Sequence, residues 1–483
     1  MKSTTEGRDG AVERELSNHQ RGIVDTCFEE GQFESAIALM EQLRTSNAKP
    51  AVSHVRQLIY IALQPEHPPA VKEMASTDVP SSPSKAALKK GIPSGPAVHA
   101  ARRLLSSYAI TNLPATIARA LPCYEDPRKD QGPHNLDGSL ESVIGPQSMC
   151  IPMAKSCWHI LTEDFTQHGP SYSLPSGKGK KRAHHSDSAD EAITGNAVVG
   201  PDAWPVLDWL LLLFEQDEML TAACGSGRFS DLLLQQIPCP RSDSGPRWDT
   251  EVPLRIVFYC LEEEDLRRQA LGTRLMTLLI NLSYAGLLDL PIFVSSVYSR
   301  LTATELEKLP ALFSGLSPSL AVHRFKVLLC QKLLTDSRHA THREARPQPQ
   351  IRAQPRALRQ TRTESSMKSI SDESVKPPTS SAQLNKTTMP GYAEIQRLVE
   401  MKVSPFSANV SSSFVLRIKF ELLTSYGMLQ SAASSAEKDA EWLAALRGGR
   451  IAHTSDLAFG SDDLEGGESG AFRTTFQSIL STW

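Results

Sequence analysis

The sequence predicts a mainly α-helical protein, in which helical hairpins form a bundle or an irregular α-solenoid with long disordered linkers. Apolar residues recur at intervals of three and four in several blocks, as they do on the buried face of a helix. Glycine or proline punctuates these blocks, as expected at helix ends. The chain of 483 residues also contains 32 prolines but only 6% aromatic residues. The prolines gather in polar stretches that cannot bury enough apolar surface to fold.

The first block, residues 11–63, predicts two antiparallel helices followed by a third. Gly31 marks the turn between the first two, because glycine readily adopts the left-handed conformation that ends a helix. Pro50 stops the chain after the second helix, and the third opens at Ala51. The expected buried faces contain Val24, Cys27 and Phe28, then Phe33, Ala36, Ile37, Met40 and Leu43, then Val52, Val55, Leu58, Ile59 and Ala62.

Two polar stretches divide the part of the chain that follows. Residues 64–97 are rich in proline, serine and lysine and predict a disordered linker. A helical segment is expected at 98–166, where apolar residues again recur at helical spacing. Residues 167–200 contain basic and acidic clusters with few apolar residues, and they predict a second disordered insert.

The main helical core is expected at residues 201–336, where several independent helix signals agree. Asp202 is placed to cap the first helix of this core, and Pro205 is tolerated within the first turn. The expected buried face of that helix contains Trp204, Leu207, Leu210, Leu211 and Phe214. Its length and apolar content indicate a helix that is buried in the core.

A third disordered linker, rich in arginine, proline and serine, is expected at residues 337–390, before a C-terminal helical segment at 391–483. Within that segment, residues 414–429 alternate in hydrophobicity as a strand does, yet their apolar positions also fit a helix. We expect a helix because the neighbouring segments are helical. The residues after Gly460 are rich in glycine and acidic side chains, which predicts a loose tail until the final stretch from Phe472 to Trp483.

The stretch from Gly31 to Pro50, GQFESAIALMEQLRTSNAKP, combines a glycine turn, a packed helix start at Phe33 and Ala36, and a proline exit. In this arrangement it resembles a single pentatricopeptide repeat, or more broadly a tetratricopeptide repeat. The resemblance implies a helical hairpin that stacks with other hairpins and recognises RNA or another protein. No whole-chain family is recognised.

A second stretch, Met219 to Leu233, resembles the first motif of S-adenosylmethionine-dependent methyltransferases. In that motif glycines let the backbone approach the ligand, and Gly225 and Gly227 carry the resemblance. Thr221 stands where the family has an acidic residue, and the preceding residues predict a helix where the family has a strand. The resemblance implies a parallel sheet, for which the chain does not supply alternating strands. We therefore disfavour a methyltransferase.

The sequence predicts no catalytic, cofactor-binding or metal-binding residues, and we expect a protein that is not an enzyme. Its eight cysteines are scattered without a CxxC pair, which favours reduced thiols over a disulfide framework or a zinc site. The most apolar stretches are too short or too polar to cross a bilayer, so no membrane association is expected. The N-terminus lacks the apolar region of a secretory signal, which predicts an intracellular protein.

Local basic clusters stand out against a formal net charge of only -3. The cluster in the second insert is typical of a nuclear import signal, and the arginine series of the third linker predicts contacts with nucleic-acid phosphates. We therefore favour the nucleus over the cytoplasm. The candidate basic contact residues are Lys178, Lys180, Lys181, Arg182, Arg352, Arg356, Arg359 and Arg362.

Taken as a whole, the sequence predicts a non-enzymatic scaffold or adaptor whose helical blocks mediate protein–protein interactions in a nuclear complex. Its basic linkers add contacts with nucleic acid. The main alternative is an RNA-binding helical-repeat protein built on the hairpin from Gly31 to Pro50. The S-adenosylmethionine-dependent methyltransferase stays the disfavoured alternative. The identity of the partners and the oligomeric state are left open.

Overall fold

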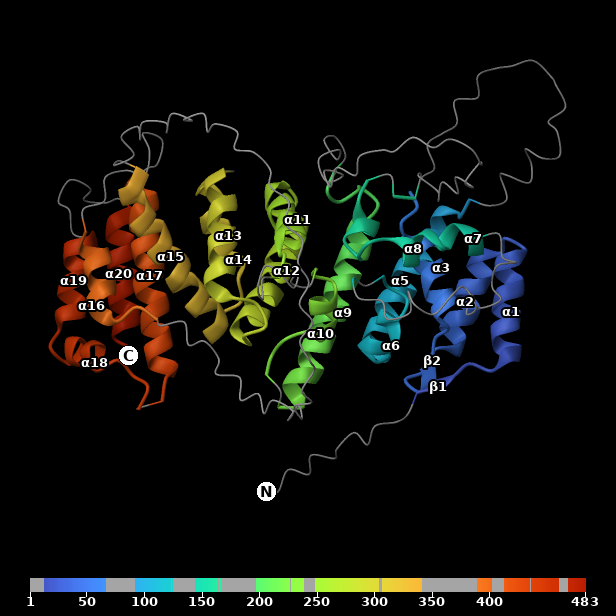
Figure 1. Ribbon diagram of the computed structural model, residues 1–483, viewed down its shortest axis with the longest axis horizontal. Helices are drawn as coiled ribbons and strands as arrows, with labels where there is room; N and C mark the ends of the chain where they lie inside the picture. The colour runs from blue at the N-terminus through green and yellow to red at the C-terminus, as the bar shows by residue number, and fades with distance from the viewer. Residues whose placement is uncertain are drawn as a thin grey trace, which may run out of the picture. The chain divides into compact units, whose positions relative to one another are not determined.

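The computed structural model describes the chain in a series of ranges separated by gaps. These ranges are 13–66, 92–122, 124, 144–163, 165–166, 197–225, 227–238, 248–303, 306–340, 389–401, 412–434, 436–459 and 468–483. Within them helices account for nearly all regular structure, and the only strands are β1 (Arg14–Glu15) and β2 (Ala48–Lys49) (Figure 1). The predicted fold class, mainly α with packed helices, is confirmed.

The chain divides into two compact units, Met1–Phe325 and Lys326–Trp483. The first unit combines the N-terminal block with the following helical segment and most of the predicted main core. Its α-helices are α1 (Asn18–Glu29), α2 (Phe33–Leu43), α3 (Val52–Ala62), α5 (Gly95–Thr111), α6 (Pro114–Ala118), α7 (Gly145–Ser148), α8 (Cys150–Met153), α9 (Trp204–Ala223), α10 (Asp231–Gln235), α11 (Glu251–Glu262), α12 (Leu266–Tyr284), α13 (Leu290–Ala303) and α14 (Leu309–Gly315). The 3₁₀ helices η4 (His159–Leu161) and η5 (Leu306–Lys308) also belong to it.

Helices α1, α2 and α3 confirm the predicted N-terminal helices. Ser17 starts α1 with a capping box, because its hydroxyl accepts the N–H of Gln20 while the Gln20 side chain accepts the N–H of Ser17. Gly31 lies in the turn before α2 with a φ of 72°, a conformation that favours glycine. Val24 and Phe28 of α1 are fully buried. The apolar spacing of the sequence therefore identified the packed face.

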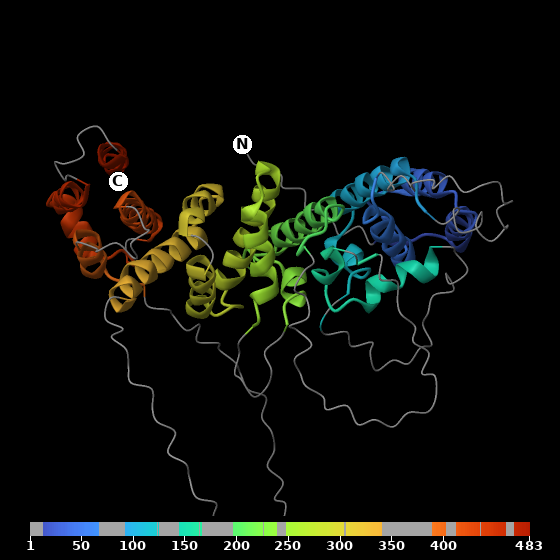
Figure 2. The same ribbon diagram turned by 90° about the horizontal axis from the view of Figure 1, so that it is seen from above.

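Successive helices of the first unit pack against one another in a regular order. α5 packs against both α2 and α3, and α9 packs against α5 and α12. α12 also packs against α11, α13 and α14. The two views show α2, α5 and α9 side by side in chain order (Figures 1 and 2). Because α9 has neighbours on several sides, it buries apolar residues around much of its circumference: Val206, Leu207, Trp209, Leu210, Leu211, Leu213 and Phe214.

Gly272 lets α11 and α12 approach each other closely. A β-carbon at this position would lie 2.7 Å from the Cβ of Cys260 and 2.9 Å from the carbonyl oxygen of Val257. Both distances are shorter than van der Waals contact, so the packing of these two helices requires a residue without a side chain. Cys260 is itself buried in this interface.

The second unit is a helical bundle around aromatic side chains. It contains most of α15 (Leu320–Ala340) together with α16 (Tyr392–Glu400), α17 (Ser412–Ala432), α18 (Ala440–Arg447), α19 (Arg450–Phe459) and α20 (Glu468–Leu480). The Trp442 ring makes edge-to-face contacts with Tyr392, Tyr426 and Trp483 at centroid distances of 5.4 to 5.6 Å. The ambiguous residues 414–429 lie within α17, which confirms the predicted helix.

Helices extend into stretches that the sequence assigned to linkers or to a loose tail. α5 begins at Gly95, inside the predicted linker 64–97, and α15 continues to Ala340. α20 begins at Glu468, a few residues before Phe472, where the predicted loose stretch was expected to end. These boundaries were wrong because composition was averaged over the stretch. The Ser94 hydroxyl, which caps α5, is a local helix-start signal that such an average hides.

The C-terminal ends of the predicted linkers 167–200 and 337–390 also belong to packed structure. In the stretch 167–200, the carbonyl of Ala197 accepts a hydrogen bond from the N–H of Glu163, at 3.3 Å. The N–H of Gly200 donates to the carbonyl of Leu161 at 2.8 Å. At the end of the stretch 337–390, Pro390 is buried. Tertiary contacts decide these boundaries, and the sequence near them carries no helix period.

Candidate functional site

A polar pocket lies where four segments of the first unit meet, and its volume is about 390 Å³. Pockets of this size accommodate small ligands or single side chains of a partner. The segments that line it are β1, α1, the start of α3 and the residue that follows α6. The polar side chains that line it include Glu15, Arg21, Asp25, Ser53, His54 and Arg119.

The chain before α1 brings these segments together. β1 pairs in parallel with β2, so that Glu15 lies beside Lys49 just before α3. The Glu13 carboxylate accepts hydrogen bonds from the N–H of Leu113, at 2.9 Å, and from the hydroxyl of Thr116, at 2.5 Å. The same residues thus tie the start of α1 to the connection before α3 and to the turn before α6. Two-residue strands have no period that a sequence pattern can reveal.

His54 of α3 and Asp25 of α1 form a pair in the wall of the pocket. The His54 Nε2 lies 2.8 Å from the Asp25 Oδ1, and the Phe28 ring lies at a centroid distance of 6.1 Å from the imidazole. The His54 side chain is only 1% exposed, and its Nδ1 has no hydrogen-bond partner among the described residues. One ring nitrogen is therefore satisfied, and the other is shielded from solvent without a hydrogen-bond partner among the described residues.

Arginine side chains surround Glu15 at the pocket. The Arg21 Nη2 lies 2.5 Å from the Glu15 carboxylate. The hydrogen bond and the charge of Arg21 lower the pKa of Glu15, and the charges of Lys49 and Arg119 lower it further. Arg119 is exposed and forms no ion pair with a described residue. The pocket lining therefore holds two carboxylates, those of Glu15 and Asp25, and two arginines, Arg21 and Arg119.

Helix α3 begins at the pocket without a side-chain cap. Ala51 stands at the N-cap position and has no oxygen to accept the first-turn N–H groups. The N–H groups of Val52, Ser53 and His54 have no acceptor among the described residues. All three residues line the pocket. The positive end of the helix macrodipole therefore faces polar space instead of a capping side chain.

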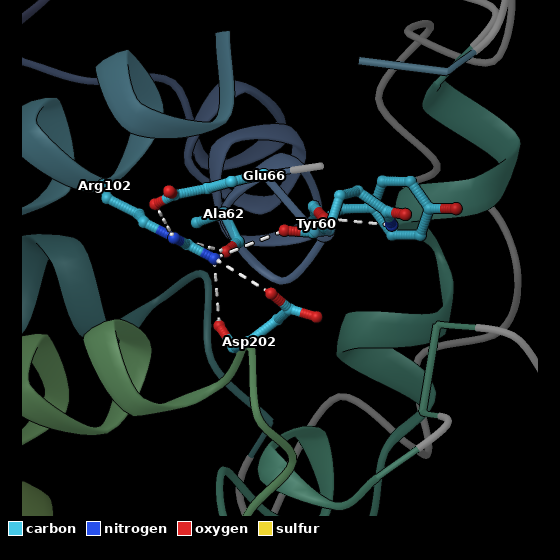
Figure 3. A network of polar contacts seen from close by, with 6 residues as sticks. Tyr60, Ala62, Glu66, Arg102 and Asp202 are labelled. Carbon is cyan, nitrogen blue, oxygen red and sulfur yellow. Dashed lines mark hydrogen bonds and ion pairs between the residues drawn. The ribbon is translucent and has the colours of Figure 1, made fainter. Parts of the chain in front are cut away.

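Arg102 of α5 joins the end of α3 to the start of α9 (Figure 3). Its Nε donates to the carbonyl of Ala62 at 2.9 Å, and its Nη2 donates to the carbonyls of Gln64 and Asp202 at 3.2 and 3.1 Å. Its Nη1 pairs with the Glu66 carboxylate. The side chain is only 12% exposed, so these carbonyls depend on it for hydrogen bonds.

The predicted capping role of Asp202 was wrong. The N-cap of α9 is Ala203, which has no capping side chain, and Asp202 offers its backbone carbonyl to Arg102. Its carboxylate lies 3.8 Å from the Arg102 Nη2. The Arg102 guanidinium of α5 lies beside the Asp202 carboxylate, and the first N–H groups of α9 receive no side-chain cap. Sequence spacing cannot show that contact.

Arg274 of α12 forms a second joint, which fixes this helix to α9. Its Nε and Nη2 donate to the two oxygens of Glu215 at 2.7 and 2.9 Å, and its Nη1 donates to Asp208 at 2.5 Å. The hydrogen bond to Glu215 is the main cause that raises the pKa of Arg274. Such a bidentate arginine–carboxylate pair fixes the orientation of the two side chains as well as their distance. α9 is therefore held by arginines from both neighbouring helices.

The glycine-containing loop that resembles a methyltransferase motif connects two helices. α9 ends at Ala223 and α10 begins at Asp231, and the described residues beside the loop contain no strand. Asp217, on the last turns of α9, accepts hydrogen bonds from the Ser230 hydroxyl at 2.8 Å and from the N–H of Leu232 at 3.0 Å. These polar groups hold the loop against its own helix. The parallel sheet that the methyltransferase alternative requires is not found in this part of the described chain.

The candidate basic contact residues of the sequence are not placed by the structure. Lys178, Lys180, Lys181, Arg182, Arg352, Arg356, Arg359 and Arg362 all lie outside the described residues. Their roles in nuclear import or nucleic-acid binding stay predictions.

The cysteines and the other residues that commonly bind metal ions form no further site in the described ranges. The six described cysteines, Cys27, Cys150, Cys157, Cys224, Cys260 and Cys330, are free thiols. Burial raises the pKa of Cys150 to about 11 and that of Cys260 to about 12, so both thiols are protonated at neutral pH. No described residues form a group of three or more histidine, cysteine or acidic side chains suited to a metal ion. None of the described helices is long and apolar enough to span a bilayer.

Sequence reasoning missed the pocket, although one local signal was present. Ala51 follows Pro50 at the start of a predicted helix, where a serine, threonine or aspartate usually supplies the cap. A helix start without a cap leaves its first N–H groups to solvent or to another partner. The pairing of His54 with Asp25 has no comparable signal, because it depends on how α1 and α3 are placed.

The hairpin that resembles a pentatricopeptide repeat has the expected local structure. Gly31 forms the turn, Phe33 and Ala36 are buried at the start of α2, and Pro50 precedes α3. Comparison with family models, curated proteins and solved structures finds no match to the chain. The pocket and the two arginine joints are therefore interpreted from their own geometry.

Proposed function

We propose that the protein is a non-enzymatic helical scaffold or adaptor that binds protein partners in a nuclear complex. The observation that carries this proposal is the exposure of apolar side chains on a helix that is held rigidly. α9 is fixed by Arg102 and by Arg274, and near its end Met219 and Leu220 are 59% and 44% exposed.

A rigid helix with exposed apolar side chains is a good partner surface for a physical reason. Because the arginine joints already fix α9, a partner that binds Met219 and Leu220 does not have to order this helix. The entropy cost of association is smaller for a preorganised surface. Methionine is also enriched at protein interfaces, where its flexible thioether adapts to the opposing surface.

The test is affinity purification of the tagged full chain from cells, with and without substitutions on α9. Met219→Ser combined with Leu220→Ser is expected to remove specific partners. Met153→Ser is the matched control, because Met153 is 73% exposed on α8 and lies away from α9 in sequence. Recovery of the same partners with the α9 variant as with the control contradicts the proposed contact.

The same purification distinguishes the RNA-binding alternative. We expect the partners to stay bound after ribonuclease treatment, since the proposed contact is between apolar protein surfaces. If the recovered material is RNA, or if every partner is lost on ribonuclease treatment, the RNA-binding alternative replaces the scaffold. Deletion of residues 341–388 in a parallel sample, which leaves α15 and the buried Pro390 in place, shows whether the arginine series carries the RNA.

The nuclear part of the proposal depends on the basic cluster at residues 178–182. Replacement of Lys178, Lys180, Lys181 and Arg182 by alanine is expected to shift a fluorescently tagged chain from the nucleus to the cytoplasm. The matched control replaces Arg352, Arg356, Arg359 and Arg362, which removes the same charge from another segment. A cytoplasmic wild-type protein contradicts the nuclear assignment.

A further inference from the structure

The outer face of α5 and the short helix α6 expose two apolar side chains between two arginines. Ile110, on the last turn of α5, is 67% exposed, and Leu113, at the start of α6, is 50% exposed. Arg103 is exposed seven residues before Ile110, so both lie on one face of the helix, about 10 Å apart along its axis. Arg119 is exposed at the end of α6. We call these four residues the α5/α6 surface.

Leu113 and Arg119 are brought together by the chain before α1. The Glu13 carboxylate accepts the N–H of Leu113 at 2.9 Å. Arg119 lines the polar pocket together with Glu15, and its positive charge lowers the pKa of Glu15. Glu13 and Glu15 belong to one short segment, so the apolar end of this surface and its second arginine meet the same stretch of chain.

Positive charge at this surface is not balanced by the helices that form it. Residues 92–121 contain no aspartate or glutamate, and neither arginine of the surface forms an ion pair with a described residue. The neighbouring Glu13 is engaged by backbone and hydroxyl donors, and Glu15 pairs with Arg21. Lys49, which lies beside Glu15, adds another cation without an ion pair in the described chain. The surface therefore favours an anionic partner.

The apolar side chains decide which kind of anion fits. Isoleucine and leucine gain free energy when another apolar group covers them, whereas recognition of single-stranded nucleic acid relies on aromatic side chains that stack on bases. Tyr108 of α5 is buried and offers no such ring at the surface. Carboxylates match the fork of an arginine guanidinium. An acidic protein segment with apolar residues thus satisfies both features of the surface.

We propose that the α5/α6 surface binds an acidic segment of a partner protein, in which apolar residues are flanked on both sides by carboxylates. The apolar residues cover Ile110 and Leu113, and the carboxylates pair with Arg103 and Arg119. Three residues of an extended segment span about 10 Å, so each carboxylate lies about three positions from the nearest apolar residue. This contact is separate from the partner contact at α9 and does not rest on it.

Fluorescence anisotropy of a labelled peptide with the full chain tests the proposal. The probe is the peptide Glu-Glu-Ser-Ser-Leu-Leu-Ser-Ser-Glu-Glu, which has the expected spacing. One control peptide has glutamine for every glutamate, and the other has serine for both leucines. We expect saturable binding of the probe and much weaker binding of both controls. A short poly-uridine strand is the nucleic-acid probe, and its tighter binding at this surface overturns the proposal in favour of nucleic acid.

Ile110→Ser combined with Leu113→Ser tests the apolar part of the surface. Both side chains are exposed, and serine is a favourable residue at the N-cap position of Leu113, so the melting temperature should not fall. We expect loss of peptide binding. Met219→Ser combined with Leu220→Ser is the matched control and should bind the peptide as the wild type does. This control separates the present surface from the proposed contact at α9.

Arg103→Glu combined with Arg119→Glu tests the charges. Peptide binding is expected to become about tenfold weaker, because two attractive pairs become repulsive. The matched control is Arg267→Glu combined with Arg447→Glu, which changes the net charge by the same amount. Arg267 and Arg447 are exposed, form no ion pair with a described residue and lie on α12 and α18. The control should leave binding unchanged.

Four results overturn the proposal. The first is a wild-type chain that shows no saturable binding of the acidic peptide. The second is equal binding of the acidic peptide and its glutamine version. The third is equal weakening by the two pairs of charge reversals, which indicates attraction by overall charge. The fourth is loss of binding in the α9 variant but not in the Ile110 and Leu113 variant, which moves the peptide site to α9.

Discussion

His54 and Asp25 are separated by 29 residues in the chain, yet the His54 Nε2 and the Asp25 Oδ1 lie 2.8 Å apart. Their hydrogen bond joins α3 to α1, two helices that are separated in sequence by the whole of α2. The pair also forms one wall of the polar pocket. A single partly buried contact therefore links the stability of the N-terminal helices to the shape of the candidate site.

Asp25→Ala is expected to lower the free energy of unfolding by about 1–3 kcal/mol, because it leaves a buried imidazole without a partner. Urea denaturation followed by circular dichroism measures this change. Glu29→Ala on the same helix is the control, since Glu29 is exposed, and its effect should stay within about 0.5 kcal/mol. Equal effects of the two substitutions show that the hydrogen bond between Asp25 and His54 does not contribute to the stability of the protein.

Arg102→Lys is expected to destabilise the protein by about 2–4 kcal/mol although the charge is kept, because several backbone carbonyls lose their donors. A lysine ammonium lacks the planar fork that reaches the carbonyls of Ala62, Gln64 and Asp202 together. Hydrogen exchange should become faster at the end of α3 and the start of α9. The exposed neighbour Arg103, replaced by lysine, is expected to change neither stability nor exchange. Unchanged hydrogen exchange in the Arg102→Lys variant shows that the Arg102 hydrogen bonds do not hold the end of α3 and the start of α9 together.

Gly427→Ala tests the packing of the last residue of the chain against α17. A β-carbon at Gly427 would overlap the Trp483 ring, so the indole must move away. We expect a red shift of tryptophan fluorescence and a free energy of unfolding that is lower by about 1–3 kcal/mol. In a Trp483→Ala background the same substitution should lower the free energy of unfolding much less, because the ring that the β-carbon overlaps is absent. At Gly470 a β-carbon meets nothing within 4 Å, so Gly470→Ala should not destabilise α20.

Lys419 is expected to make the second unit less stable as the pH falls from 10.5 to 8. Its side chain is 6% exposed, and burial lowers its pKa from 10.5 to about 8. Between these values the unfolded chain binds more protons than the folded one, so stability decreases as the pH falls and stays low below pH 8.

Lys419→Met should remove this pH-dependent penalty. Because the Lys419 Nζ donates to the carbonyl of Met401 at 2.7 Å, the substitution also loses one hydrogen bond. We expect the free energy of unfolding to rise by about 2 kcal/mol at pH 7 and not to rise at pH 10.5. Chemical denaturation at both pH values measures this change. A variant that is equally stabilised at both pH values contradicts a lowered pKa for Lys419.

Local signals in the sequence were sufficient to place most helices. Gly31 and Pro50 act through their own backbone preferences, so the first three helices could be predicted without knowledge of any partner. The apolar spacing of residues 414–429 fits the helix that the structure contains. The boundaries at Gly95 and Glu468 were missed because they depend on short caps and contacts within polar stretches.

The amino-acid sequence determined that the described chain is helical and which face of each N-terminal helix is buried, because helix period and capping act over a few residues. The tertiary structure alone decided that Arg102 binds the carbonyl of Asp202 and that His54 meets Asp25. It also decided that Arg119 and the uncapped start of α3 line the same pocket. These contacts join residues that are far apart in the chain, and their energy depends on a geometry that exists only after the helices have packed.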